Sequence, residues 1–280
     1  MAIKQGFSKY NGFHFITASP MTGEPVLNLI QTRLSGNTKT GKVLQTWHLN
    51  PDMDPLEARR YGAGDERICG NDECEHRAKE DQKQGTCYVF GFVLVGLYKA
   101  YLRGRYPHWS EFGDTLAEVL TKAGSGKNVR LGAYGDPVCL GEANVAALVC
   151  EAKTFLGYTH QWKRDELAWA KDYMMASVDT PEMLLAADAR EWRAFSVYSP
   201  DVAPSEALQR MRSHGLKVLR CPASKEAGEK ANCNNCPIEC SGKASKVQHH
   251  VMIQAHGAKP IMNRYKASSM HTAWQQQPTS

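Results

Sequence analysis

The sequence predicts an α/β protein whose parallel strands form a (β/α) barrel or partial barrel of about six to eight strands. Three observations support this prediction. Short apolar strand patterns alternate with helical patterns, no G-x-G-x-x-G motif follows a strand, and polar residues gather where the strands end. A barrel keeps its active site at the carboxyl ends of its strands. An open doubly wound sheet also binds ligands there and stays the alternative.

Length and composition limit the class of protein. The chain has 280 residues, of which 42% are hydrophobic and 22% charged, and we expect a single α/β domain over 1–280. The net charge of +5 is too mild to require an anionic partner. The most apolar run, 87–102, is shorter than the about 20 residues that span a bilayer. No segment resembles a secretory signal, so we expect a cytoplasmic protein without a membrane partner.

The first residues, 1–42, predict an antiparallel β-ribbon and a polar loop. Strand patterns at 14–18 and 25–34 flank a turn. The loop at 35–42 is rich in small residues, but its glycine, lysine and threonine are not in the order that a phosphate-binding loop needs. We therefore expect no phosphate-binding loop there.

The barrel core is expected over 43–220, a cysteine-rich metal-binding loop over 221–247, and a closing strand with a polar tail over 248–280. Helices in the core tend to start at Asp, Pro or Glu, as the pair Asp136-Pro137 illustrates. The strand patterns are 43–49, 129–135, 156–162, 174–179, 194–199, 217–221 and 249–257. The helical patterns are 87–103, 110–124, 141–155, 163–172, 181–191 and 204–214.

Four cysteines form a C-x11-C-x2-C-x3-C pattern near the C-terminus: Cys221, Cys233, Cys236 and Cys240. Two thiols separated by two residues can bind one metal from a tight loop, and the other two complete a tetrahedron or a cluster. The segment between them is too polar to pack alone, so we expect a metal to stabilise its fold. The spacing alone does not separate zinc from an iron–sulfur cluster.

A second cysteine group follows the strand at 43–49: Cys69, Cys74 and Cys87. Three thiolates, with His76 near them in sequence, can hold a metal with one open position, as a catalytic site requires. Unrelated thiols in a loop are the alternative. The remaining two cysteines, Cys139 and Cys150, are expected to pack in the core.

Polar and aromatic residues at the strand ends form a third group, which would meet at one mouth of the barrel: Tyr134, Asp136, His160, Trp162, Ser177, Asp179 and His256. Acids, two imidazoles and an aromatic ring there could bind a small polar ligand, and we take Asp136, His160, Asp179 and His256 as catalytic candidates. Each has an ordinary alternative. The aspartates suit helix caps, and the histidines suit satisfied core positions.

The chain resembles a family of phage and plasmid proteins built around gene product eighty-eight of actinophages. The resemblance covers most of the chain and implies a protein of a mobile element in the cytoplasm of a bacterial host. Relatives carry few functional labels, one of them as rolling-circle replication initiators. The matching motifs are SGNTKTG at 35–41, the Cys87-Tyr88 pair, YGDP at 134–137, GYTHQW at 157–162, MASVD at 175–179, the cysteine run from Cys221, and His256-Gly257.

The arrangement is also similar to radical S-adenosylmethionine enzymes, which are full or partial (β/α) barrels. This resemblance implies that the loop Cys69, Cys74 and Cys87 holds a 4Fe-4S cluster and that Tyr134, Gly135, Ser177, Asp136 and Asp179 lie near bound S-adenosylmethionine. It also implies an auxiliary cluster on Cys221, Cys233, Cys236 and Cys240. The usual C-x3-C-x2-C becomes C-x4-C-x12-C here, and Gly-Gly-Glu becomes Tyr-Gly-Asp. Cluster binding needs only converging thiolates, whereas radical chemistry also needs S-adenosylmethionine in a fixed pose.

Three functions follow from these patterns. The first is an iron–sulfur metalloenzyme acting on a small or nucleotide-like substrate. The second is a zinc-stabilised nucleic-acid-binding or replication protein, and the third is an interaction protein in which the barrel is only a scaffold. The nucleic-acid hypothesis depends on aromatic rings that could stack bases and on basic residues near the C-terminal cysteines. These residues are Trp47, Tyr158, Trp162, Lys217, Arg220, Lys225, Lys230, Lys243 and Lys246.

Overall fold

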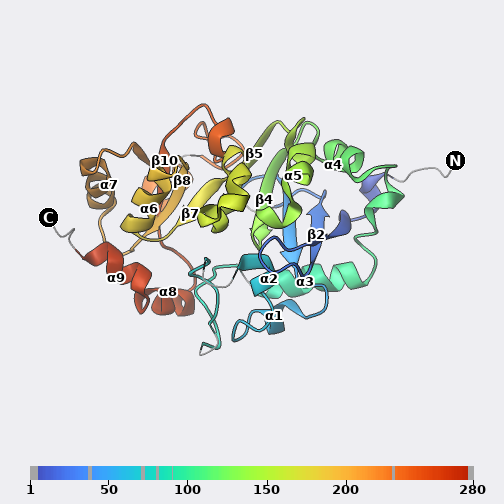
Figure 1. Cartoon of the computed structure of the whole chain (residues 1–280), viewed down its shortest axis with the longest axis horizontal. Helices are drawn as coiled ribbons and strands as arrows, with labels where there is room; N and C mark the ends of the chain where they lie inside the picture. The colour runs from blue at the N-terminus through green and yellow to red at the C-terminus, as the bar shows by residue number, and fades with distance from the viewer. Residues whose placement is uncertain are drawn as a thin grey trace.

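The computed structural model describes residues 6–36, 40–70, 73–79, 82–89, 91–228 and 231–276. Figure 1 shows two groups of strands lying side by side, each with its own helices. The expected β-ribbon is present. Strand β1 (Phe13–Ala18) pairs antiparallel with β2 (Pro25–Gln31), and β2 pairs antiparallel with β3 (Leu44–Leu49). Part of the polar loop, 37–39, lies outside the described residues.

Ten strands form two five-stranded sheets. The first sheet is mixed, in the order β1-β2-β3-β4-β5, and its strands β3, β4 (Asn128–Tyr134) and β5 (Thr154–Leu156) are parallel. The second sheet is all parallel, in the order β6-β7-β8-β10-β9. Its strands are β6 (Tyr158–Thr159), β7 (Met175–Val178), β8 (Ala194–Tyr198), β9 (Val218–Arg220) and β10 (His250–Gln254).

The two sheets share the segment 154–159. Strand β5 pairs with β4, and β6, one residue further on, pairs with β7. Gly157 lies between β5 and β6, and its carbonyl oxygen accepts a hydrogen bond of 3.0 Å from the Met175 amide. The parallel strands therefore continue from one sheet into the next.

The predicted α/β class is confirmed, but a closed barrel is not found in the part of the chain that the structure describes. Strands β1 and β9 are edges, each paired with one neighbour. The ribbon explains the open edge, because β2 occupies the side of β3 that a closing parallel strand would need.

Helices cover the outer faces of the sheets. Five of the six predicted helices correspond to α3 to α7. The start of the pattern at 110–124 is a separate 3-10 helix, η2 (Trp109–Glu111), which precedes α4. The sixth pattern, 163–172, is the 3-10 helix η5 (Asp165–Asp172). The last part of the chain, expected as a strand and a polar tail, also holds two helices, α8 and α9. The α-helices are α1 (Pro55–Ala58), α2 (Glu66–Cys69), α3 (Gly91–Leu102), α4 (Leu116–Gly124), α5 (Glu142–Val149), α6 (Pro181–Ala189), α7 (Pro204–Ser213), α8 (Lys259–Lys266) and α9 (Ser269–Gln275).

The two faces of the second sheet have different partners. Ala176 and Val178 of β7 belong to the main core with residues of α6 and α7. Met175, on the other face, packs in a smaller cluster with Cys221 and Ile238. Side chains alternate across a strand, so the cysteine-rich segment covers the face opposite the helices. Among the described residues, no helix has the length and apolarity to cross a membrane.

Candidate functional site

The first cysteine loop lies over the carboxyl ends of β4 and β6. The Asp136 amide, just after β4, donates a hydrogen bond of 2.6 Å to the Ile68 carbonyl in α2. The Gln161 side chain, just after β6, donates one of 2.9 Å to the Cys69 carbonyl. These bonds attach the start of the loop to the ends of two parallel strands, where barrels and open α/β sheets bind their ligands.

Two arginines hold the rest of this loop. Arg77 donates to the Asp65 carboxylate, to Glu66 at 2.9 Å and to the Gly62 carbonyl at 2.6 Å. Arg59 donates to the carbonyls of Val89 at 2.7 Å and Cys87 at 3.3 Å. Charge-assisted bonds of this kind are stronger than neutral ones, so they fix a loop that has little helix or strand of its own.

The three thiols of the loop converge on one cavity. The cavity has a volume of about 30 Å³, and its lining includes Cys69, Cys74, Cys87, His76 and Tyr134. Within the described residues, the buried Tyr134 hydroxyl has no hydrogen-bond partner. A buried polar atom without a partner is costly, so a bound group in the cavity would suit it.

The three thiols differ in how easily they ionise. Burial and the neighbouring Cys74 raise the pKa of Cys69 well above its ordinary value, and burial raises the pKa of Cys87. Burial also acts on Cys74, but the charge and hydrogen bond of His160 and the charge of His76 outweigh it and lower the pKa of that thiol. Cys74 is therefore the thiol most readily present as thiolate, the form that binds metals.

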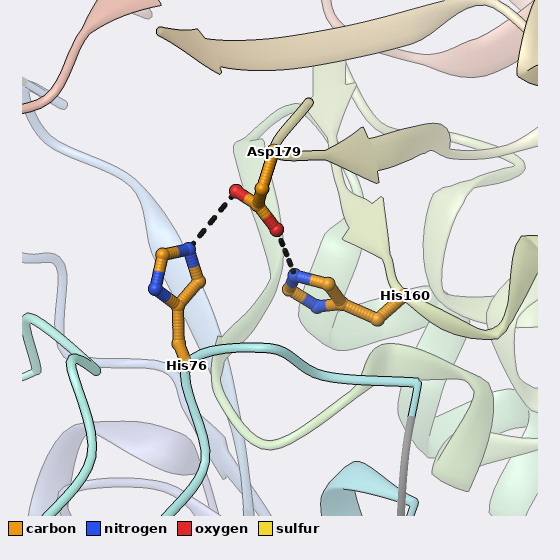
Figure 2. Close-up of side chains that lie close together, drawn as sticks. All are labelled: His76, His160 and Asp179. Atoms are coloured by element: carbon orange, nitrogen blue, oxygen red, sulfur yellow. Dashed lines mark hydrogen bonds and ion pairs between the residues drawn. The ribbon is translucent and has the colours of Figure 1, made fainter. Parts of the chain in front are cut away.

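Next to Cys74, two imidazoles surround a buried carboxylate. The Nε2 atom of His76 lies 3.0 Å from Oδ1 of Asp179, and Nε2 of His160 lies 3.6 Å from Oδ2 (Figure 2). The Asp179 side chain has no exposed surface. Both rings point at the carboxylate, one from the cysteine loop and the other from the end of β6.

Charge interactions in this group are strong. Burial raises the pKa of Asp179, but the two imidazoles outweigh it and hold that pKa well below its ordinary value. Burial lowers the pKa of His160, but Cys74 and Asp179 outweigh it and raise that pKa well above normal. The pKa of His76 is raised as well, because Asp179 outweighs burial. Without a bound cation, protons on the imidazoles balance the negative groups.

Asp136 caps a turn, which was the alternative to its predicted catalytic role. Its Oδ2 accepts hydrogen bonds from Thr159 Oγ1 at 3.0 Å and the His160 amide at 2.8 Å, and its Oδ1 accepts one from the Val138 amide at 3.2 Å. These contacts cap the turn after β4 and fix the backbone of His160. Asp136 therefore positions His160 rather than facing the cavity.

The remaining predicted residues of this site have different surroundings. Gly135 has φ +73°, and a Cβ there would lie 2.7 Å from the Cβ of His48, so a close strand contact explains this glycine. Ser177 is partly buried, two residues before Asp179 on the same face of β7. His256 is exposed after β10, where its Nδ1 lies 2.9 Å from the Gln254 carbonyl oxygen, and it does not join the group around Asp179.

The C-terminal cysteines converge too, but elsewhere. Cys221, Cys236 and Cys240 belong to one small apolar cluster with Met175, and Cys233 interacts electrostatically with Cys240. Burial raises the pKa of Cys240 to about 12, and the other three thiols add to this increase. All nine cysteines lie within the described residues, and no two form a disulfide.

The C-terminal cysteines and the first cysteine loop contact different residues around β6. The carbonyl of Cys240 accepts a hydrogen bond of 3.1 Å from Gly157, just before β6, and Tyr158 hydrogen-bonds the Cys240 thiol. His160, two residues further on, hydrogen-bonds Cys74. The two groups are therefore contacted by different residues of the β6 segment, Tyr158 and His160.

Sequence reasoning also misjudged some side chains. Trp47 and Trp162 are 6% and 2% exposed, so they cannot stack on bases. Cys139 is buried as expected, whereas Cys150 is exposed. His76 was noted only as a neighbour of the cysteines, although it is the closest partner of Asp179. The motif Cys74-Glu75-His76 was the available signal, since it puts a thiol and an imidazole two residues apart.

Comparison of the chain with family models, with curated proteins and with solved structures finds no match. The functional argument therefore depends on the geometry of the site itself.

Proposed function

We propose that the chain is a metal-dependent protein whose Cys69, Cys74 and Cys87 bind an iron–sulfur cluster. One observation carries this proposal: three thiols from a single connection after β3 line one cavity over the ends of parallel strands. Tyr134, with its unpartnered hydroxyl, lines the same cavity. Arg59 also lines it, and its charge would offset that of a thiolate, whereas the charge of Arg77 is already paired with Asp65 and Glu66.

The spacing of the sulfurs does not match a single zinc ion held in a tetrahedron of cysteines. Zinc bound at 2.3 Å in a tetrahedron holds its sulfur ligands about 3.8 Å apart. In a 4Fe-4S cluster each thiolate would bind a different iron, so the sulfurs would lie farther apart than around one ion. Within the described part of the chain, no three cysteine sulfurs lie within 4.8 Å of one another.

A cluster held by three thiolates has an iron without a protein ligand and supplies one-electron chemistry. The chain's own residues would keep Cys74 ionised chiefly through the charge and hydrogen bond of His160. Action on S-adenosylmethionine and a small or nucleotide-like substrate is the finer form of this proposal, and it rests on resemblance. The internal bonds of Asp136 weaken it, since they occupy the carboxylate that would bind the methionine group.

The experiment is anaerobic purification followed by visible absorption spectroscopy. We expect a brown protein whose sulfur-to-iron absorption falls in C69A, C74A and C87A. The matched control is C150A, which removes an exposed thiol at the end of α5 and should leave the spectrum unchanged. A colourless, folded protein with stoichiometric zinc would contradict the proposal.

A further inference from the structure

The group around Asp179 has the geometry of a second, separate metal site. One ring nitrogen of each of His76 and His160 and a carboxylate oxygen of Asp179 all lie within 4.8 Å of one another. An ion bonded to such atoms at about 2.0 to 2.2 Å separates them by about 3 to 3.5 Å. The observed N···O distances, 3.0 and 3.6 Å, are close to this range.

Two atoms in this group lack hydrogen-bond partners. In the described part of the chain, His160 Nε2 and Asp179 Oδ2 are both buried and unpartnered. They face each other across 3.6 Å, which is too long for a hydrogen bond. Each has an unused lone pair when the imidazole is neutral. An ion between the two atoms would satisfy both.

The surroundings of the three residues hold them in place. His76 Nδ1 lies 2.7 Å from Thr86 Oγ1, which fixes the ring, and Nε2 shares a hydrogen bond of 3.0 Å with Asp179 Oδ1, in which a metal ion would replace the proton. The Asp179 carbonyl accepts a hydrogen bond of 2.9 Å from Trp274 Nε1 of α9, and Asp136 fixes the backbone of His160. Histidine ligands in metal sites are oriented by such contacts of their second nitrogen.

We propose that His76, His160 and Asp179 bind a single divalent transition-metal ion through two Nε2 atoms and the carboxylate. Two imidazoles with one carboxylate suit zinc or ferrous iron, whereas magnesium and calcium prefer oxygen ligands alone. Three protein ligands leave positions for water or a substrate. The site shares no ligand with the proposed cluster, although His160 hydrogen-bonds the Cys74 thiol.

The test measures bound metal ions and acid-labile sulfide per chain in wild type, H76Q and D179N, after anaerobic loading with Zn²⁺ or Fe²⁺. We expect one ion fewer per chain in both variants and the same sulfide content. Zn²⁺ affinity of the cluster-free chain, measured against a chromophoric chelator, should fall by more than about 100-fold, because losing outer partners alone costs 10- to 100-fold. The metal is identified as the one, Zn²⁺ or Fe²⁺, whose loading gives wild type one more ion per chain than the variants.

The matched control is D188N. Asp188 lies 3.0 Å from His250 Nε2 in a similar pair that, among the described residues, belongs to no group of three possible ligands, so its loss should remove no ion. H76Q changes a side chain on a loop and keeps the test valid if D179N does not fold. Equal ion content in H76Q and wild type would overturn the site. Parallel loss of sulfide in H76Q would assign these residues to the cluster and overturn it as well. If wild type and all variants lack sulfide, but H76Q binds one ion fewer than wild type, only the proposed cluster is contradicted.

Discussion

His48 has a lowered pKa, whereas the pKa values of His76 and His160 are raised. It is fully buried in β3, with Nδ1 2.7 Å from Asn28 Oδ1 and Nε2 3.2 Å from Thr46 Oγ1. Burial lowers its pKa to about 3. With no carboxylate beside it, the ring stays neutral and acts only as a hydrogen-bonding part of the core.

We predict that this histidine gives the protein a measurable pH dependence. Its pKa is lower in the folded than in the unfolded state, so its contribution is complete above about pH 6.5. The contribution decreases as the pH falls towards 3, by at most about 1.4 kcal/mol per pH unit. Urea unfolding of wild type and H48Q between pH 4 and 7 should show a flatter profile for the variant. Equal slopes would contradict the prediction, and H214Q, at an exposed position, controls for histidine loss.

The environment of Gly135 predicts how much an alanine there would destabilise the protein. Alanine there would combine a positive φ with a Cβ 2.7 Å from that of His48. We expect G135A to lower the free energy of unfolding by about 2 to 4 kcal/mol, from backbone strain and overpacking together. The control is G96A in α3, where nothing lies within 4 Å and alanine should stabilise by up to about 1 kcal/mol. Similar denaturation midpoints for the two variants would refute this account.

At the scale of elements, strands were easier to predict than helices. The strand patterns at 129–135, 174–179 and 194–199 match β4, β7 and β8 within a residue at each end, and in β4 and β8 buried residues alternate with less buried ones, the period that marks a strand. Helices α2 and α9 were not predicted. They have four and seven residues, too short to be stable alone, so tertiary contacts determine them.

Helix α9 supplies the next prediction through Trp274. Its Nε1 donates to the carbonyls of Asp179 at 2.9 Å and Val197 at 3.0 Å, at the ends of β7 and β8. W274F leaves two buried carbonyls without this donor and should cost about 1 to 3 kcal/mol in chemical denaturation. W169F, at a partly buried ring in η5, is the control. If W274F costs no more than W169F, these hydrogen bonds do not stabilise α9.

At the scale of the whole molecule, the site combines segments that are distant in sequence. His160 and Asp179 were predicted because each follows a strand, and parallel strands bring their ends together. His76 was noted beside the cysteines but not assigned to this group, because contacts of Arg77 with Asp65 and Glu66, and no strand, set the path of its loop. His256 also follows a strand, but it is exposed and apart from the group. A residue's position after a strand predicts that it lies at the carboxyl end of the sheet. Which of these side chains meet there depends on tertiary packing.

The central claim is that the first cysteine loop binds an iron–sulfur cluster. Elemental analysis of iron, acid-labile sulfide and zinc in the anaerobically purified chain tests it most directly, with the C69A/C74A/C87A variant measured beside wild type. The account predicts equal amounts of iron and sulfide bound to the loop, seen as a loss of both in the variant. The same iron and sulfide content in the folded variant and in wild type, or zinc without sulfide in wild type, would contradict it.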